Sequence, residues 1–481
     1  MTLRGLQLDG HKSRPCSGPI RSVPPPATLV LALDQGAGEE AVPVVRPGDA
    51  VRVGATLATA TGAAAALHSP VSGIVREVVA RSTPRGTSRC IVIDNDGRDE
   101  PAAPGGPIDW QALDGATLLA RVAAAGVAGF GGAAFPTATK LALARAAGAD
   151  LLLLNGAECE PWICCDDALM RERAPEVVLG AQVMLAAAGA RRCVIAIEDD
   201  KPAAVAAIES AVRAADDARI EVRVLPALFP LGAEGPLVTA VTGREVPHDG
   251  WPPQVGVVCQ NVATAAAVAR LVRDGRPVVS RIVTVTGSGV QEPANVEARI
   301  GTPLAALVAA CGGYAATDVR RIAGGSLTGR LLDDDDVPVT KGLNCLLLAT
   351  AGDLPPRAAE MPCIRCGDCA DVCPAGLLPQ QLHVAARTGD STGLARYGLG
   401  ACIECGCCDY VCPSSIPLTA RFRAAREREH LAEIERRRAL EAKARYERHQ
   451  RRLAEQGEVE RRAFDAARRR AGGADPGGTA P

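Results

Sequence analysis

The sequence contains no hydrophobic segment long enough to cross a membrane. A membrane-spanning helix needs about 20 predominantly apolar residues, and no run of even about 18 residues is continuously apolar in this chain. The N-terminal stretch MTLRGLQLDGHKSRP also lacks the apolar core of a secretory signal peptide. We therefore expect neither a transmembrane helix nor a signal peptide, so that any membrane association is peripheral.

No lysine occurs between Lys12 and Lys140, and this gap limits what the first predicted domain can do. Residues 29–97 read as short strands separated by turns such as Arg46-Pro-Gly-Asp49. The pattern resembles the biotinyl/lipoyl-like barrel sandwich, whose carrier domains attach a cofactor to a lysine at a hairpin tip. Without a lysine a swinging-arm role is excluded, and we expect a structural role for this domain.

Cysteine, in contrast, is abundant, and eight of the 18 cysteines form two matching runs. Residues 363–374 and 402–413 both read C-x2-C-x2-C-x3-C-P. This is the bacterial ferredoxin spacing for [4Fe–4S] clusters, in which the fourth cysteine ligates the other cluster. A zinc site needs only four ligands and would not repeat the pattern. Disulfides suit secreted proteins, whereas most other cysteines here lie singly in apolar contexts, as in a reducing cytosol.

The spacing assigns each cluster three ligands from one run and one from the other. The first predicted set is Cys363, Cys366, Cys369 and Cys412, and the second is Cys402, Cys405, Cys408 and Cys373. Cys407 adds a neighbouring thiol, which we assume does not ligate iron.

Residues 110–275 follow a Pro- and Gly-rich linker at 98–109 and alternate between helical and strand patterns. Apolar runs in this region predict buried parallel strands, and the segments between them predict crossover helices. We therefore expect a Rossmann-like α/β domain. The strands are expected over 149–154, 193–197 and 219–225, and the helices over 175–189 and 202–216.

Residues 276–350 change character again, with a hairpin predicted over 280–286 and 295–300 and a short helix over 304–310. This pattern resembles the soluble-ligand-binding β-grasp (SLBB) module that is found beside flavin domains. Asp333–Asp336 is interpreted as a solvated loop, because a calcium site needs interleaved ligands at fixed spacing.

The remaining segments complete a multidomain α/β chain. We expect an N-terminal arm over 1–28, an α-helical ferredoxin-type domain for the two clusters over 351–420, a charged helix over 421–470 and a disordered tail over 471–481. The charged helix holds 17 Lys or Arg against 10 Asp or Glu. It is interpreted as a solvated helix or, alternatively, as a contact with an acidic membrane surface or partner.

Three segments of the α/β domain carry residue types that suit a flat, phosphate-bearing cofactor. Residues 129–140 cluster glycines, which let backbone N–H groups approach a phosphate or a ring, and end at the cation of Lys140. Residues 154–161 (Leu-Asn-Gly-Ala-Glu-Cys-Glu-Pro) and 259–264 (Cys-Gln-Asn-Val-Ala-Thr) follow predicted strands. Ligands of open α/β sheets bind outside the carboxyl ends of the strands, which is where these segments are placed.

With these segments, the chain resembles the C subunit of the Rnf electron-transport complex over nearly its whole length. The motif stretches that carry the resemblance are residues 129–137, 155–161, 164–171, 231–234, 242–247 and 260–264. The α/β domain is also similar to the flavin-bearing subunit of respiratory complex I. The resemblance implies noncovalently bound FMN with NADH stacked on it. By position, it assigns cofactor contacts to Gly129, Gly131, Gly132, Lys140, Asn155, Glu158, Glu234, Asn261 and Thr264, and catalytic roles to Glu158 and Glu160.

The resemblance also implies a function, that of an ion-translocating ferredoxin:NAD oxidoreductase. The chain would be its peripheral subunit at the cytoplasmic face of the inner membrane, with other subunits and a ferredoxin as partners and no contact with nucleic acid. It would exchange hydride between NAD(H) and FMN and relay single electrons through its clusters. The alternatives are a soluble flavin/iron–sulfur reductase of the cobalamin-reductase type and a non-catalytic relay or docking subunit.

Two departures from the family pattern bear on the relay alternative. Ala134 replaces a usual glycine and is expected to add a methyl group where the cofactor approaches, and Gly235 replaces a usual lysine. Both are expected to weaken nucleotide binding rather than to alter the fold.

Overall fold

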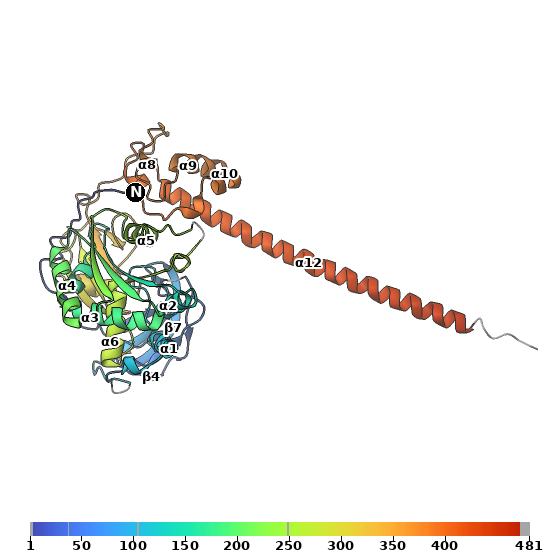
Figure 1. The fold of residues 1–481 in the computed structure, drawn as a ribbon, viewed down its shortest axis with the longest axis horizontal. Helices are drawn as coiled ribbons and strands as arrows, with labels where there is room; N and C mark the ends of the chain where they lie inside the picture. The colour runs from blue at the N-terminus through green and yellow to red at the C-terminus, as the bar shows by residue number, and fades with distance from the viewer. Residues whose placement is uncertain (1–2, 37, 103–104, 248–249, 472–481) are drawn as a thin grey trace, which may run out of the picture. The chain divides into compact units, whose positions relative to one another are not determined.

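A computed structural model describes residues 3–36, 38–102, 105–247 and 250–471 of the chain (Figure 1). Apart from Ala471, the tail expected over 471–481 lies outside these residues. Within the described ranges, every helix falls short of the apolar length that crossing a membrane requires.

The chain divides into two compact units, which are described separately. One unit comprises Met1–Gln381 with Gly400–Thr419, and the other comprises Leu382–Leu399 with Ala420–Pro481. The first unit contains the sandwich, the α/β domain, the SLBB-like module and both cysteine runs.

The N-terminal sandwich is built from two small antiparallel sheets. Their strand orders are β2-β8-β7-β4 and β3-β5-β6. Alternate residues such as Leu29, Leu31, Ile91 and Ile93 are fully buried and form one core with Leu57 of the second sheet. The expected barrel-sandwich fold is confirmed. The strands are β2 (Thr28–Ala32), β3 (Val42–Pro43), β4 (Ala50–Val51), β5 (Thr56–Thr59), β6 (Leu67–His68), β7 (Gly73–Thr83) and β8 (Gly86–Asn95).

A parallel four-stranded sheet in the order β11-β10-β9-β12 forms the centre of the α/β domain. Residues 151–154 of β9 are all fully buried, as expected for an inner strand of a parallel sheet. The carboxyl edge of this sheet carries Asn155 and Asn261, which lie opposite each other in register. The expected α/β fold is confirmed. The strands are β9 (Leu151–Gly156), β10 (Arg192–Glu198), β11 (Ile220–Leu225) and β12 (Val257–Asn261).

Helix α3 packs against α4 and α6 in the same domain (Figure 1). It begins at Cys165, but Arg173, with a φ of −133° and a ψ of 32°, is not helical and kinks it, so two helical segments join there. Pro175 lies in the first turn after the kink, where proline is favoured. The helix predicted over 175–189 is the second segment, and the first segment was not predicted. The helices are α1 (Gly115–Ala124), α2 (Thr137–Ala146), α3 (Cys165–Ala188), α4 (Pro202–Ala215), α5 (Glu234–Thr242) and α6 (Val262–Asp274).

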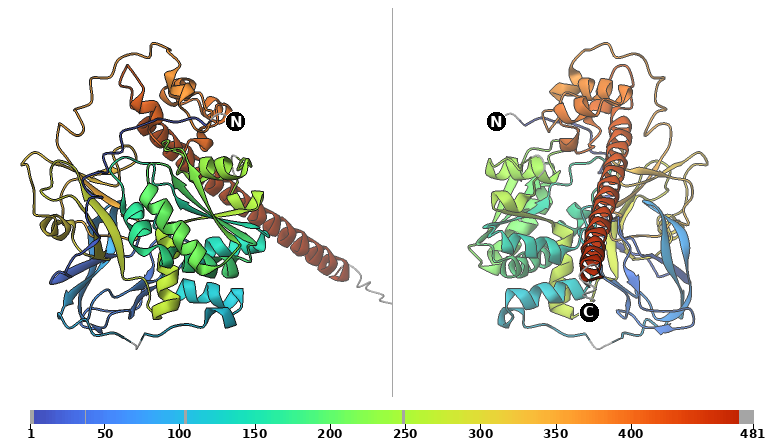
Figure 2. Two further views of the ribbon diagram at one scale, coloured as in Figure 1. Left: turned by 60° about the vertical axis from the view of Figure 1, so that its left-hand side comes forward. Right: turned by 90° about the vertical axis from the view of Figure 1, so that its right-hand side faces the viewer.

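A mixed six-stranded sheet in the order β1-β14-β13-β17-β15-β16 forms the SLBB-like module. Strands β13 and β14 pair antiparallel, which confirms the expected hairpin, and the expected short helix is α7. Strand β1, from the N-terminal arm, was not predicted and pairs in parallel with β14. Figure 2 shows this sheet and the sandwich on the same side of the α/β domain. The elements are β1 (Arg21–Ser22), β13 (Ser280–Thr286), β14 (Ala294–Arg299), α7 (Leu304–Ala310), β15 (Arg320–Ala323), β16 (Arg330–Leu332) and β17 (Cys345–Ala349).

Lys341, from the SLBB-like module, is buried where three domains meet. Its Nζ donates 2.6 Å hydrogen bonds to the carbonyl oxygens of Ala66 in the sandwich and Gly126 in the α/β domain. Burial lowers the pKa of Lys341 to about 7. The two backbone acceptors offset part of the cost of burying the amine, so this contact fixes the three domains to one another.

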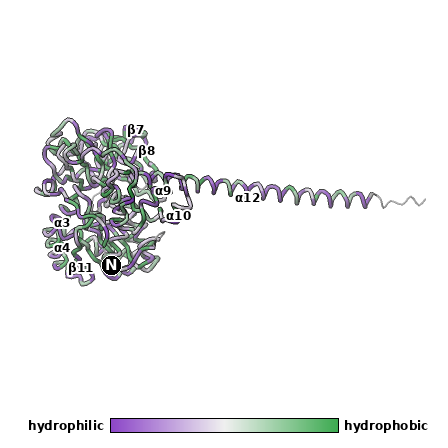
Figure 3. The backbone as a smooth tube through the Cα atoms, turned by 90° about the horizontal axis from the view of Figure 1, so that it is seen from above, coloured by the Kyte–Doolittle hydropathy of each residue, from purple (hydrophilic) through white to green (hydrophobic). Residues whose placement is uncertain are grey.

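The second unit contains α10 (Ser391–Arg396) and nearly all of α12 (Leu418–Ala471). Helix α12 spans 54 residues, and hydrophilic residues dominate its length (Figure 3). Ser391 donates a 2.7 Å hydrogen bond to Glu429, which fixes α10 against the beginning of α12. The charged helix expected at this end of the chain is confirmed.

Gly180 allows a test of how closely α3 and α6 approach, and Gly457, in another helix, is its control. A Cβ placed at Gly180 of α3 would lie 1.9 Å from the carbonyl oxygen of Ala265, whereas one at Gly457 of α12 would meet nothing within 4 Å. We predict that Gly180→Ala lowers the free energy of unfolding by about 1–3 kcal/mol through overpacking. Gly457→Ala should instead stabilise α12 by up to about 1 kcal/mol, because alanine favours the helix. Urea denaturation followed by circular dichroism measures both, and a Gly180→Ala variant as stable as wild type would contradict the close approach.

Candidate functional site

A cavity of about 210 Å³ lies at the carboxyl edge of the parallel sheet. All three segments singled out in the α/β sequence contribute to its wall, together with residues 229–233 and the second cysteine run. Residues that line it include Gly131, Asn155, Glu158, Glu160, Asn261 and Cys405. The structure thus brings five of the predicted cofactor or catalytic residues to one cavity that also reaches a predicted cluster ligand.

Thr264 anchors the glycine-rich loop through a hydrogen bond. The buried Thr264 hydroxyl accepts a 2.9 Å hydrogen bond from the backbone N–H of Phe130, between Gly129 and Gly131. Thr264 was predicted to contact the cofactor, but it is fully buried and does not line the cavity. Gly132, also predicted as a contact, has a φ of +110°, a conformation that favours glycine.

Ala134 does not place its methyl group in the cavity, which corrects the expectation from the sequence. The residue is 1% exposed, and its Cβ lies 3.6 Å from where a Cβ at Gly342 would be. Its φ of +50° explains why a glycine would also suit this position. The substitution therefore changes packing behind the loop rather than the cofactor face.

Lys140 and Glu234, two predicted cofactor contacts, form an ion pair with each other. The Lys140 Nζ lies 2.5 Å from Glu234 Oε1, at the first residue of α5. A negative side chain is favoured at a helix N-terminus. Neither residue lines the cavity, and a side chain at the neighbouring Gly235 would meet nothing within 4 Å.

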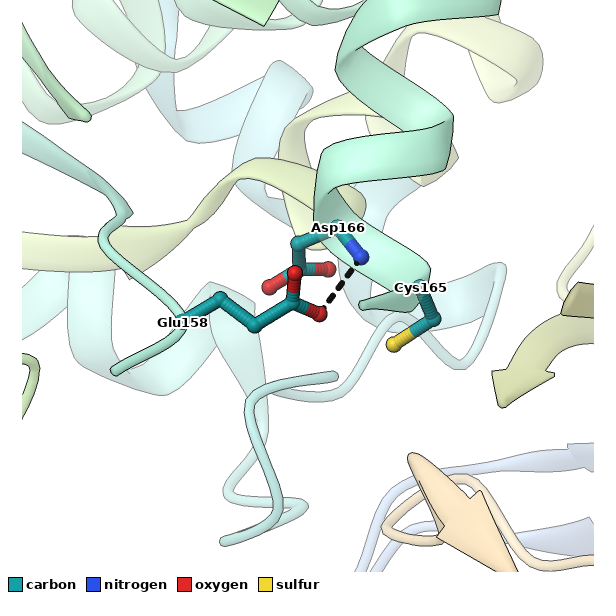
Figure 4. A group of neighbouring side chains, drawn as sticks. All are labelled: Glu158, Cys165 and Asp166. Atoms are coloured by element: carbon teal, nitrogen blue, oxygen red, sulfur yellow. Dashed lines mark hydrogen bonds between the residues drawn. The ribbon is translucent and has the colours of Figure 1, made fainter. Parts of the chain in front are cut away.

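The half-buried Glu158 and the buried Asp166 form a carboxylate pair (Figure 4), and both line the cavity. Glu158 accepts hydrogen bonds from the backbone N–H groups of Asp166 (2.7 Å) and Asp167 (3.0 Å), at the beginning of α3. Asp166 in turn accepts a 2.5 Å hydrogen bond from the Asn261 side chain. Burial raises the pKa of Glu158; burial and the charge of Glu158 raise the pKa of Asp166 to about 7.

Cys165 completes this group, since its Sγ and the two carboxylates lie within 4.8 Å of one another. Burial raises the pKa of the Cys165 thiol well above its usual value, which disfavours the thiolate that a metal ligand requires. Both carboxylates already accept the hydrogen bonds described above, from backbone N–H groups and from the Asn261 side chain, so their oxygen atoms have partners without a metal ion.

Glu160 connects the cavity to the SLBB-like module. Its carboxylate accepts hydrogen bonds from the backbone N–H groups of Leu327 (3.0 Å) and Thr328 (2.8 Å), and from the Thr328 hydroxyl (2.5 Å). Cys159, the preceding residue, accepts a hydrogen bond from the Gly232 N–H at 3.3 Å. The loop after β9 therefore holds two other loops of the cavity in place.

The two cysteine runs fold alike but differ in exposure. Gly367 and Gly406, at the same position in each run, have φ values of +97° and +80°, turns that glycine allows. Cys363 and Cys366 are exposed, whereas their counterparts Cys402 and Cys405 are half-buried; the third cysteine of each run, Cys369 or Cys408, is buried. Among the described residues, the cysteines of the runs form no disulfide.

Several sulfur atoms lie near one another as the ferredoxin spacing predicts, but Cys407, which was assumed not to ligate iron, also interacts with Cys405, Cys408 and Cys373. Cys369 interacts electrostatically with Cys363 and Cys366, and Cys408 with Cys402 and Cys405. Cys373, from the first run, interacts with Cys405 of the second.

Sequence reasoning missed several residues of the cavity. Phe229, Pro230 and Thr328 line it; Phe229 and Pro230 lie outside any metal-binding or glycine-rich pattern, whereas Thr328 lies in the glycine-rich stretch 324–329, which was not singled out. The motif at 231–234 was the nearest signal, because it adjoins Phe229 and Pro230.

Four family models match successive parts of the chain. The RnfC barrel sandwich hybrid domain matches residues 2–98, and the Nuo51 FMN-binding domain matches residues 122–270. The SLBB domain matches residues 282–331, and the 4Fe-4S dicluster domain matches residues 362–416. These matches confirm the expected fold class and the order of its domains.

Similar proteins, each named as the C subunit of an ion-translocating oxidoreductase complex, align along most of the chain. The Pseudomonas aeruginosa protein is 43% identical over 96% of this chain and 59% of its own length. The Erwinia tasmaniensis protein is 40% identical over 99% of this chain and 59% of its own length. The Rhodobacter capsulatus protein is 41% identical over 88% of this chain and 82% of its own length. The chain belongs to the RnfC family, the C subunits of ion-translocating oxidoreductase complexes.

Membership of the RnfC family confirms the resemblance that the motifs indicated. The chain spans about 59% of the length of the Pseudomonas and Erwinia relatives. The FMN-binding and dicluster matches assign FMN and two [4Fe–4S] clusters to this chain as cofactors.

The residues at the two sites fit these cofactors. Gly131 and Gly232 line the cavity, and as glycines they bring backbone without a side chain to its wall, where a flat ring could approach. The cysteine runs supply eight thiols at ferredoxin spacing.

We predict that Thr264→Val weakens FMN binding, because it removes the acceptor of the Phe130 N–H while keeping the side-chain shape. An unpaired buried donor costs about 1–3 kcal/mol, so we expect FMN affinity to fall about tenfold. Thr264→Ser keeps the hydroxyl and is the matched control. Titration of FMN fluorescence measures the Kd of each, and equal values for the two variants would contradict the role of this hydrogen bond.

We predict that Asp166→Asn reduces the pH dependence of stability. Because the folded-state pKa of Asp166 is about 7, the folded chain binds more protons than the unfolded chain between pH about 4 and 7. Wild type should therefore lose stability as the pH rises through this range, and the variant should lose less. Thermal melting at several pH values tests this, with Asp318→Asn, an exposed position, as the control. Parallel profiles for wild type and Asp166→Asn would contradict it.

Proposed function

We propose that this chain exchanges hydride between NAD(H) and FMN and passes single electrons through its two clusters. Its place would be the NADH-facing subunit of a membrane-bound ion-translocating ferredoxin:NAD oxidoreductase. The observation that carries the proposal is that Cys405 lines the same cavity as Asn155, Glu158 and Asn261. A cluster held by Cys405 is thereby adjacent to the predicted flavin site.

FMN supplies the chemistry that the clusters lack, since a flavin accepts two electrons as hydride and releases them singly. The chain's own residues would bind and orient it. Gly131 and Asn261 would face the flavin, Thr264 would hold the glycine-rich loop, and the Lys140–Glu234 pair would lie at its margin. Gly129, Gly132 and Asn155 complete the proposed cofactor contacts, and Glu158 and Glu160 are the proposed catalytic carboxylates.

The carboxylate pair supports a role for Glu158 in controlling charge at the flavin. Glu158 and Asp166 share a wall of the cavity, and burial raises the pKa of each. Groups with perturbed pKa values in a cavity are typical of functional sites. In this arrangement Asp166, with a pKa of about 7, would take up or release a proton near neutral pH and so balance charge at the cavity wall.

The exposure of the cysteine runs supports an order for the clusters. The set of Cys402, Cys405, Cys408 and Cys373 adjoins the cavity, whereas Cys363 and Cys366 of the other set are exposed. Met361 and Ile364, at 61% and 67% exposure, surround the exposed set with apolar surface. Electrons would therefore pass between the flavin and the set that adjoins the cavity first, and between the set with the exposed Cys363 and Cys366 and a partner second.

The remaining parts of the proposal concern partners and location. The partners would be the other subunits of the complex and a ferredoxin, and the chain would lie peripherally on the cytoplasmic face of the inner membrane. The inward-turned methyl group of Ala134 removes one reason for a relay role without catalysis. The long charged α12 suits attachment to a larger complex better than a free reductase.

Serine substitutions in the two runs test this order. The chain is purified anaerobically with FMN, iron and sulfide, and reduced with NADH. We expect Cys366→Ser to leave reduction of the other cluster intact, and Cys405→Ser to allow flavin bleaching while reduction of the remaining cluster by NADH is lost or much slowed. Flavin absorbance and EPR of the reduced clusters report the two steps.

The outcomes separate the proposal from its alternatives. No flavin bleaching in wild type would favour the relay subunit. Cluster reduction in Cys405→Ser at the wild-type rate would contradict the proposed order. Retention of activity with no association with membranes in cells would favour a soluble reductase.

A further inference from the structure

The first part of the N-terminal arm, residues 3–16, pairs through its backbone with the loop around Phe229, which lines the cavity. The Leu6 N–H donates to the Phe229 carbonyl at 2.7 Å, and the Phe229 N–H donates to the Leu6 carbonyl at 2.9 Å. A Cβ at Gly5 would lie 2.3 Å from the Phe229 oxygen, so only glycine permits this approach. The arm is therefore seated closely on the loop that lines the cavity.

Leu6 buries its side chain against the second cysteine run. Leu6, Phe229 and Cys407 form one apolar cluster, with exposures of 8%, 4% and 1%. Cys405 and Val372 pack against it, and Val372 directly follows α8 (Asp368–Asp371), which Figure 1 labels. Apolar side chains thus exclude water from the side of Cys405 that faces the arm.

Arg4 brings a positive charge to the same place. Its Nη1 lies 3.9 Å from the position of a Cβ at Gly376, and its charge acts on the sulfur of Cys373. Cys373 is the member of the first run that the ferredoxin spacing assigns to the second run's cluster. Leu6 and Arg4 therefore approach two ligands of one predicted cluster from the same arm.

Contacts further along the arm tie it to the flavin cavity. The His11 ring stacks on Trp162, with centroids 4.4 Å apart and an interplanar angle of 11°. The backbone N–H of Trp162 donates a 2.8 Å hydrogen bond to the Gly10 carbonyl, and Lys12 Nζ donates to the backbone carbonyl of Glu158. The arm thus runs from the wall of the cavity to the cluster beside it.

We propose that Leu6 and Arg4 are positioning residues that set the reduction potential of the cluster bound by Cys373, Cys402, Cys405 and Cys408. Solvent exposure and nearby charge both tune iron–sulfur potentials. Water stabilises the extra negative charge of the reduced cluster, so the apolar cover lowers the potential, whereas the Arg4 cation raises it. Among the described contacts, neither Leu6 nor Arg4 approaches Cys363 or Cys366 of the other cluster. The two clusters therefore differ in potential. This inference rests on the cluster order in the proposed function.

EPR-monitored redox titration of the full-length protein, loaded with FMN and both clusters, tests the inference without NADH. We expect Leu6→Ser to shift the potential of one cluster to a more positive value. Arg4→Gln should shift the same cluster to a more negative value, with FMN occupancy unchanged in both. Leu3→Ser and Arg14→Gln change exposed residues of the same arm and should leave both potentials as in wild type.

The affected cluster is identified in a Cys366→Ser background, where it should retain its shift. A faster loss of iron from that cluster to a chelator in Leu6→Ser gives a second readout of water entry. The inference is overturned if both clusters shift together, if neither variant shifts either cluster, or if the control variants shift as much. If Leu6→Ser does not fold, Arg4→Gln, which changes a residue at the protein surface, still tests whether the arm sets the potential of this cluster. Because NADH is absent, failure of hydride transfer leaves this result unaffected.

Discussion

The hydrogen bonds that the Glu158 carboxylate accepts at the beginning of α3 are the constraint on which the rest of the site depends. The first N–H groups of a helix lack partners within the helix and favour a negative charge. Glu158 satisfies two of them while its own backbone adopts a φ of +51°, which is unfavourable without such support. This closes the loop between β9 and α3, and Cys159 and Glu160 then hold the two neighbouring loops.

Much of the architecture follows from local sequence, because it depends on residues that are close in the chain. Buried runs such as Leu151–Leu154 have the length of strands, and the two cysteine runs carry all their spacing within 12 residues each. The part of α3 before Arg173 was not predicted, because Pro175 marks a helix start in the sequence, and nothing local indicates that a kink joins this start to an earlier helical segment.

The parts of the site that sequence did not predict depend on contacts between distant residues. Whether Lys140 faces a phosphate or Glu234 is decided by the position of α5, and the direction of the Ala134 methyl group is decided by packing near Gly342. The pairing of Leu6 with Phe229 joins residues more than 200 positions apart without any sequence motif. Such contacts require the assembled fold.

A cryo-EM structure of the chain loaded with FMN and both clusters tests the central claim most directly, namely that the flavin site adjoins the cluster bound by Cys405. We expect the flavin ring in the cavity between Asn155 and Cys405, and a cluster ligated by Cys373, Cys402, Cys405 and Cys408 as its nearest neighbour. A flavin bound away from this cavity, or one closer to the cluster at Cys363 and Cys366, would contradict the claim.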